Sequence, residues 1–115
     1  MPTPIRRLLA VVALTVSLAA CNPPAPPDAA VVAGGFRFQP QTLEVPAGTT
    51  ITWRNADAVN HSATAGLPGE PGGPFDIQLA QAGTSGRHHF DQAGTYPYFC
   101  TFHESMTGEV VVTDS

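Results

Sequence analysis

The sequence predicts an all-β fold in which seven or eight short strands form a sandwich or a barrel. Segments of three to six residues alternate apolar and polar side chains, which is the period of a half-buried strand. Turn-forming residues separate these segments, and the chain of 115 residues contains 11 glycines and 12 prolines. We find no helical periodicity of ten or more residues after the apolar N-terminal run, so the strands must pack on one another.

Eight segments after the N-terminal region fit this pattern. Ile51 and Trp53 lie on one face of the most β-branched segment, and Trp53 is expected in the core. Residues 66–74 are rich in glycine and proline and are expected to form a loop. His88 and His89 are adjacent in a strand, so they face opposite ways and cannot both line one site. The expected strands are residues 36–38, 42–45, 49–54, 61–65, 75–79, 87–90, 96–99 and 108–113.

The N-terminal region has the character of a processing segment rather than of a strand. Arg6 and Arg7 precede an apolar run of about a dozen residues, as in a secretory signal. This run is too short to cross a bilayer, which takes about 20 apolar residues. The run ends in Leu18-Ala-Ala-Cys21, which resembles a bacterial lipobox and implies cleavage before Cys21 and lipidation of its sulfur. A plain signal with a chance cysteine, or a buried helix, is the alternative.

These features divide the chain into three parts. Residues 1–20 are expected to be a lipoprotein signal peptide, and residues 21–30 a lipidated cysteine with a proline-rich tether. Residues 31–115 form the folded domain, which we expect to be exported and anchored through Cys21 at a membrane, on the periplasmic or another extracytoplasmic side. The net charge of −4 argues against a nucleic-acid partner, which would require a basic surface.

Three metal-binding side chains lie close together near the C-terminus. Cys100, His103 and Met106 fall within seven residues, in a loop between two expected strands. His61 follows another strand and turn and is the obvious fourth ligand. One thiolate, two imidazoles and one thioether match a copper electron-transfer site. Zinc is the alternative, because Cys-x₂-His is half of a zinc-finger spacing, but a zinc site would leave Met106 unused.

The number of cysteines supports a metal at this position. The chain has two cysteines, and if Cys21 carries lipid then Cys100 has no partner for a disulfide. A lone thiol in an exported domain needs another explanation, and metal ligation supplies one.

Residues 35–113 resemble cupredoxins of the plastocyanin, pseudoazurin and amicyanin group. The Cys-x₂-His-x₂-Met loop is closest to amicyanin, and Phe102 departs from the group, where proline is frequent. The motifs that carry the resemblance are Asn60-His61, Gly94-Thr-Tyr-Pro-Tyr-Phe-Cys100, Cys100-Thr-Phe-His103, and Met106 before Gly108. The resemblance implies a Greek-key β-sandwich with one copper held by His61, Cys100, His103 and Met106.

The resemblance also implies particular roles for neighbouring residues. Asn60 is expected to help tie the two ligand loops together, and Tyr96 to be a structural corner residue. We expect His61 to be the more buried imidazole and His103 to lie near the surface as the electron port. Phe102 and Leu67-Pro68 are expected to add an apolar rim for docking, unless Phe102 only packs its own loop.

The expected function is one-electron transfer between redox proteins by a monomer, without enzymatic activity. Copper sequestration or delivery is the alternative. An oxidase or reductase would need a histidine beside the cysteine to reach a second copper, whereas the neighbours here are Phe99 and Thr101. An adhesion-type sandwich would leave the ligand spacing to chance.

Overall fold

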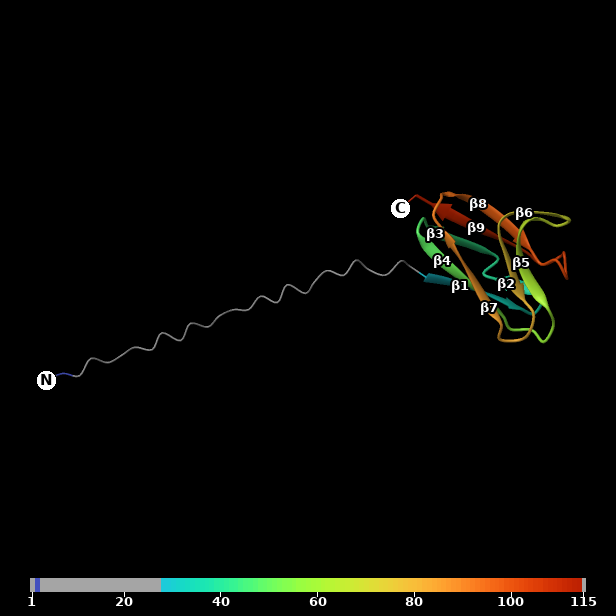
Figure 1. Ribbon diagram of the computed structural model, residues 1–115, viewed down its shortest axis with the longest axis horizontal. Helices are drawn as coiled ribbons and strands as arrows, with labels where there is room; N and C mark the ends of the chain where they lie inside the picture. Colours follow the sequence, from blue (N-terminus) through green and yellow to red (C-terminus); the bar gives the residue numbers. More distant parts are fainter. Residues whose placement is uncertain (1, 3–27, 115) are drawn as a thin grey trace.

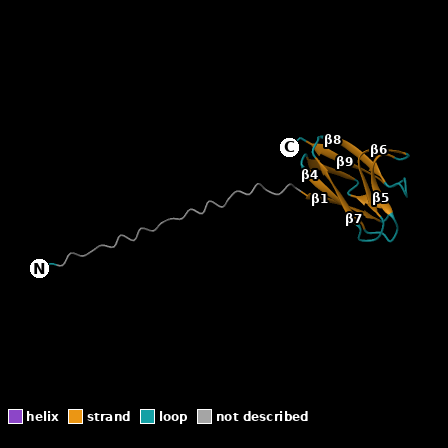
Figure 2. Cartoon of the chain, viewed as in Figure 1, coloured by secondary structure: helices purple, strands orange, loops and turns teal. Residues whose placement is uncertain are grey.

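The computed structural model describes residues 28–114, together with Pro2. The expected signal peptide, the lipidation site at Cys21 and most of the expected tether lie outside the described residues. The described part of the chain is built from strands and loops (Figures 1 and 2). The strands are β1 (Asp28–Gly34), β2 (Arg37–Gln39), β3 (Thr42–Pro46), β4 (Thr49–Asn55), β5 (His61–Leu67), β6 (Glu70–Leu79), β7 (Ser85–Phe90), β8 (Gly94–Phe99) and β9 (Thr107–Thr113).

The strands form two sheets that pack face to face, which confirms the all-β sandwich. One sheet has the order β2-β1-β4-β7 and the other the order β3-β9-β8-β5-β6. Most neighbours are antiparallel, but β1 runs parallel to β4, and β3 runs parallel to β9. Across residues 28–114 we find no helix long and apolar enough to cross a membrane.

Residues 28–114 form nine strands, one more than the eight that the sequence pattern indicates. The additional strand is β1, which begins at Asp28, inside the segment expected to be a tether. Val31 and Ala33 are fully buried on its inner face, so β1 belongs to the core. Its small side chains make the alternation weak in sequence, and the parallel pairing with β4 supplies what the sequence pattern lacks.

The prediction of a loop at residues 66–74 is wrong for most of this range. Instead β5 continues to Leu67 and β6 begins at Glu70, and the two strands pair as a hairpin. Gly66 and Gly69 have φ angles of 122° and 78°, a backbone conformation that favours glycine. The glycines therefore shape a bulge and a tight turn rather than an open loop.

Trp53 lies at the centre of the core between the sheets, as expected. Its ring stacks on Phe75 at 5.2 Å between centroids and meets Tyr98 edge-on at 5.5 Å. The same buried cluster includes Cys100 and Met106, so the core continues to the end of the sandwich where the candidate ligands lie. The candidate site is therefore supported by rigid packing rather than by loops alone.

The remaining aromatic and histidine residues have structural contacts. The Tyr96 hydroxyl donates to the carbonyl of Gln92, 2.8 Å away, which agrees with a corner role. His88 is half-buried and packs on Phe75 and Phe90, whereas the exposed His89 lies beside Asp91. The two histidines alternate in burial along β7, as their adjacency predicts.

Candidate metal centre

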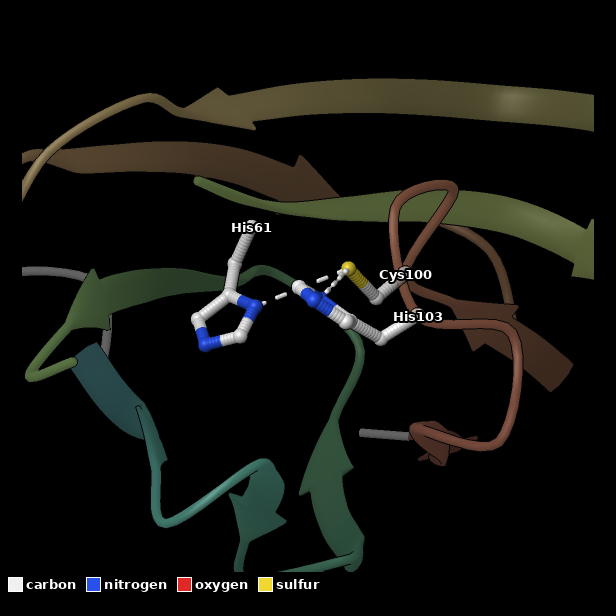
Figure 3. Close-up of side chains that lie close together, drawn as sticks. All are labelled: His61, Cys100 and His103. Carbon is white, nitrogen blue, oxygen red and sulfur yellow. Dashed lines mark hydrogen bonds between the residues drawn. The ribbon is translucent and has the colours of Figure 1, made fainter. Parts of the chain in front are cut away.

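His61, Cys100 and His103 come together at one end of the sandwich. His61 is the first residue of β5, and the other two lie in the loop between β8 and β9. The Cys100 sulfur lies 3.7 Å from Nδ1 of His61 and 3.8 Å from Nδ1 of His103. Figure 3 shows both rings turned toward the sulfur. The three donor atoms all lie within 4.8 Å of one another, so one ion could contact them all.

Met106 ends the same loop and directly precedes β9. The Met106 amide donates to the carbonyl of His103 at 2.8 Å, and the Cys100 amide donates to the carbonyl of Met106 at 3.0 Å. These two bonds close the loop into a compact turn. The Met106 side chain is 2% exposed and belongs to the same buried cluster as Cys100. The loop therefore brings a thioether to the buried side of the site.

The donor spacing fits a metal with trigonal geometry. A metal bonded to nitrogen at about 2.0–2.1 Å and to sulfur at about 2.3 Å, with 120° between the bonds, separates the two donors by about 3.7 Å. The observed separations of 3.7 and 3.8 Å are of this size. Thiolate, imidazole and thioether together suit copper, whereas zinc sites take cysteine, histidine and carboxylate. The residues present therefore fit one copper ion.

Burial differs among the ligands in the expected way. His61 and Cys100 are fully buried, while His103 is half-buried and lies next to Phe102, which is 51% exposed. The site is thus enclosed on the core side and approachable on the His103 side. Glu104 is exposed, as expected for a solvated charge in this loop.

Ser62, rather than Asn60, ties the two ligand loops together. Asn60 is exposed, and the hydrogen bonds seen between the two segments within residues 28–114 come from Ser62 instead, so the structure does not show the tie expected of Asn60. The fully buried Ser62 accepts a hydrogen bond from the Thr101 amide at 2.9 Å, and its hydroxyl also lies 3.1 Å from the Thr101 hydroxyl. Ser62 follows His61, and Thr101 follows Cys100, so this contact links the two ligand-bearing segments directly.

Asp57 is a site residue that sequence reasoning missed. Its Oδ2 lies 2.7 Å from Nε2 of His61, the ring nitrogen that does not face the sulfur. The carboxylate also accepts the amides of Gly35 at 2.8 Å and Phe36 at 3.0 Å. The Phe36 amide, followed by the His61 and Gly35 contacts, lowers the pKa of the Asp57 carboxyl below its usual value.

The β4–β5 loop that carries Asp57 is built on Asn55. The Asn55 side chain is fully buried and donates to the carbonyls of Val59 and Leu79 at 2.7 and 2.8 Å. Its side-chain oxygen accepts the Asp57 amide at 2.8 Å. The loop conformation is thus fixed by Asn55, and the carboxylate of Asp57 is free to contact groups outside its own loop.

Phe36 covers the site from the turn between β1 and β2. Its ring meets His61 edge-on at 5.6 Å and His103 edge-on at 5.0 Å. Phe36 has a φ of 58°, which is uncommon for a residue other than glycine, and its side chain is 51% exposed. Nothing in the local sequence marks this residue, because its contacts depend on how the sheets pack.

Comparison with known proteins finds similar domains in one family. The family of cupredoxin-like domains matches residues 7–112. Amicyanin from Paracoccus denitrificans is 38% identical over 81 residues, covering 67% of this chain and 59% of the relative. Plastocyanin from Tetradesmus obliquus is 33% identical over 87 residues, covering 69% of this chain and 60% of the relative. The chain thus spans about three fifths of these two curated relatives.

A solved structure agrees over a larger share of its length. The purple cupredoxin from Nitrosopumilus maritimus superposes with a TM-score of 0.67 and 32% identity, covering 75% of this chain and all of that one. These relatives bear the names of cupredoxins rather than of enzymes, in agreement with the expected absence of catalysis. On this evidence, the chain belongs to the family of cupredoxin-like domains.

Proposed function

We propose that this protein is a one-electron carrier that binds one copper ion through His61, Cys100, His103 and Met106. The main support is the convergence of the buried Cys100 sulfur with two imidazole nitrogens, which lie 3.7 and 3.8 Å from it and within 4.8 Å of each other. Copper bound there would cycle between Cu(II) and Cu(I). Thiolate and thioether ligands favour Cu(I), whereas imidazoles suit both states.

The packing around the ligands supports transfer rather than chemistry on a substrate. His61 and Cys100 are fully buried and Met106 is nearly so, which leaves little room for rearrangement when the charge of the metal changes. Burial of the thiol also weighs against copper delivery, because a metal that is passed on needs ligands that a recipient can reach. The donor set is suited to retaining its ion.

Electron exchange is proposed to occur on the His103 side. Phe36 and Phe102 are each 51% exposed, and they lie next to or against His103. A hollow beside Met106 shares Phe36 with this surface, and it is lined by Phe36, Arg37, Phe38, Gln41, Ser105, Met106 and Thr107. Apolar rings around a half-buried ligand suit brief docking of a redox protein, because they exclude water without requiring many fixed contacts. The protein is proposed to act as a monomer.

Export and membrane attachment form a second part of the proposal. The basic start, the apolar run and Leu18-Ala-Ala-Cys21 support a signal peptide over residues 1–20 and a lipid on Cys21. Expression in a bacterium fed a labelled fatty acid tests this. The wild-type chain should take up the label and fractionate with membranes, whereas Cys21→Ser should do neither. Labelling of Cys21→Ser would contradict the assignment.

The visible spectrum of the protein with Cu(II) tests the metal assignment. We expect an intense blue or green band that ascorbate bleaches. Cys100→Ser should abolish the band, while Met106→Gln should keep copper with a lower reduction potential. Ser105→Ala, an exposed neighbour, is the matched control and should leave the band unchanged. A colourless protein that binds zinc tightly, or an intense band in Cys100→Ser, would show the assignment to be wrong.

A further inference from the structure

The imidazoles of His61 and His103 are both linked to the carboxylate of Asp57, directly in one case and through Phe36 in the other. We infer that Asp57 is a positioning residue that orients His61 through a direct hydrogen bond and His103 through the ring of Phe36. This inference rests on the proposed function, because it concerns how the copper ligands are held. It assigns a role to a residue that contributes no donor atom to the metal.

The direct contact is between Asp57 and His61. Nδ1 of His61 faces the Cys100 sulfur, so the metal-binding nitrogen is Nδ1 and the proton of the neutral ring is on Nε2. Nε2 donates to the Asp57 carboxylate across 2.7 Å. This bond fixes the rotation of the ring and makes the imidazole a stronger donor to the metal. His61 is fully buried, so water cannot easily replace the carboxylate.

The indirect contact begins at the β1–β2 turn. Gly35 and Phe36 have φ angles of 62° and 58°, and their two successive amides both donate to Asp57. Successive amides directed at one anion form an anion-binding nest. A left-handed conformation is unfavourable for phenylalanine, so these two hydrogen bonds hold Phe36 where it would otherwise not stay. The carboxylate thereby fixes the backbone from which the Phe36 ring extends to His61 and His103.

The Phe36 ring then restrains the less buried of the two histidine ligands. His103 lies in a loop, and within residues 28–114 its ring makes a hydrogen-bond contact only with the Cys100 sulfur. The edge of Phe36 at 5.0 Å and the ring of His61 at 5.2 Å are its aromatic neighbours. Because His61 and Phe36 are both held by Asp57, loss of the carboxylate should loosen both of these ring contacts of His103.

Two substitutions separate the two contacts. Asp57→Asn preserves size but removes the negative charge and one of the two acceptor oxygens, so it cannot satisfy the Gly35, Phe36 and His61 donors together. Phe36→Gly removes the ring and keeps the backbone, because glycine tolerates a φ of 58°. Glu104→Gln removes one exposed negative charge next to His103 without touching Asp57 and is the matched charge control.

The first measurements are copper affinity and reduction potential of the full chain. Loss of a group that hydrogen-bonds to a ligand typically weakens metal binding by about 10- to 100-fold. The Asp57 carboxylate should stabilise Cu(II) more than Cu(I). If Asp57→Asn weakens Cu(II) binding tenfold more than Cu(I) binding, the reduction potential rises by about 59 mV. Glu104→Gln should change the potential much less. Equal shifts in both variants would show a general charge effect and overturn the inference.

The second measurement is NMR of the diamagnetic Cu(I) form. In the wild type the Nε2 proton of His61 should be visible and protected from exchange. In Asp57→Asn it should exchange faster, because a neutral amide oxygen accepts a weaker hydrogen bond than a carboxylate. The ring signals of His103 should broaden in both Asp57→Asn and Phe36→Gly. The double variant should lose less affinity than the sum of the two single variants, because both act on His103 through one path.

Each outcome decides one part of the inference. A rapidly exchanging His61 Nε2 proton in the wild type would refute the direct contact, even if Asp57→Asn did not fold. Unchanged His103 signals in Phe36→Gly, or additive losses of affinity, would refute the indirect contact. Failure of the proposed function is distinguishable, because it would already appear as a wild-type protein without the intense copper band.

Discussion

Replacement of Ser62 by alanine should weaken the connection between the two ligand-bearing segments. The Ser62 hydroxyl accepts the Thr101 amide at 2.9 Å and lies 2.9 Å from the Thr64 hydroxyl. Alanine fits the same space but accepts no hydrogen bond. The Thr101 amide, which is partly buried, would then have no acceptor.

The size of the loss follows from which groups can find another partner. The Thr64 hydroxyl keeps its bond to Asp76 at 2.9 Å, and the Thr101 side chain is exposed to water. Only the Thr101 amide is left unsatisfied, and an unsatisfied buried group costs about 1–3 kcal/mol. Because this amide is only partly buried, we expect a loss of roughly 1–2 kcal/mol. For a domain of this size that lowers Tm by roughly 4–16 °C.

Thermal and urea unfolding of the metal-free protein measure this effect without interference from ligand binding. Ser105→Ala is the matched control, because Ser105 is exposed in the same loop and a surface substitution should stay within about 0.5 kcal/mol. If Ser62→Ala were as stable as Ser105→Ala, the Ser62–Thr101 contact would not hold the segments together.

Two further predictions concern the body of the sandwich. In Gly108→Ala the new Cβ would overlap the Cζ and hydroxyl of the buried Tyr98, so the free energy of unfolding should fall by about 1–3 kcal/mol. In the control Gly72→Ala the new Cβ meets nothing within 4 Å, so denaturant titrations should show a nearly unchanged stability. Equal stability of these two variants would contradict the packing at Tyr98. Burial lowers the pKa of His88 below its ordinary 6.5; the charge of His89 adds to this shift and Asp91 opposes it. The unfolded chain therefore binds a proton at His88 more readily than the folded chain does. The free energy of unfolding should consequently fall as the pH drops below about 6.5. Unfolding of His88→Gln across this range should show a weaker pH dependence, and an unchanged slope would contradict the assignment to His88.

Local patterns in the sequence predict most of the sandwich. Alternation within β4 depends only on neighbouring residues, and so does the spacing of Cys100, His103 and Met106 in one loop. The proximity of His61 to that loop is a long-range feature. It could be predicted from the resemblance and from the number of ligands, but not from any local pattern.

The features that sequence reasoning missed depend on strand register. In the antiparallel β5–β8 pair, Thr64 lies opposite Phe99, and the same register continued places Ser62 opposite Thr101. Asn60 lies before the first residue of β5, so it does not share this alignment. Asn60 and Ser62 are both polar neighbours of His61, and only the pairing of the strands decides which of them reaches the loop that carries Cys100.

Asp57 follows from a second register. In the parallel β1–β4 pair, Ala33 lies opposite Asn55, so two residues further Gly35 comes beside Asp57. The sequence pattern does not predict β1 as a strand, and without this strand the proximity of residues 35 and 57 cannot be predicted. Because the small side chains of β1 give only a weak alternation, the sequence pattern predicts neither this strand nor the contact of Asp57 with His61.

The direction of β1 also determines how the domain would stand on a membrane. β1 begins at Asp28 and leads to the Gly35–Phe36 turn at the metal site, a path of roughly 20 Å along an extended strand. The chain therefore enters the sandwich at the end far from His103. If Cys21 carries lipid as proposed, residues 22–27 can span at most about 20 Å, which keeps the entry end near the bilayer. The copper ligands would then point away from the lipid, toward partners that approach from the aqueous side.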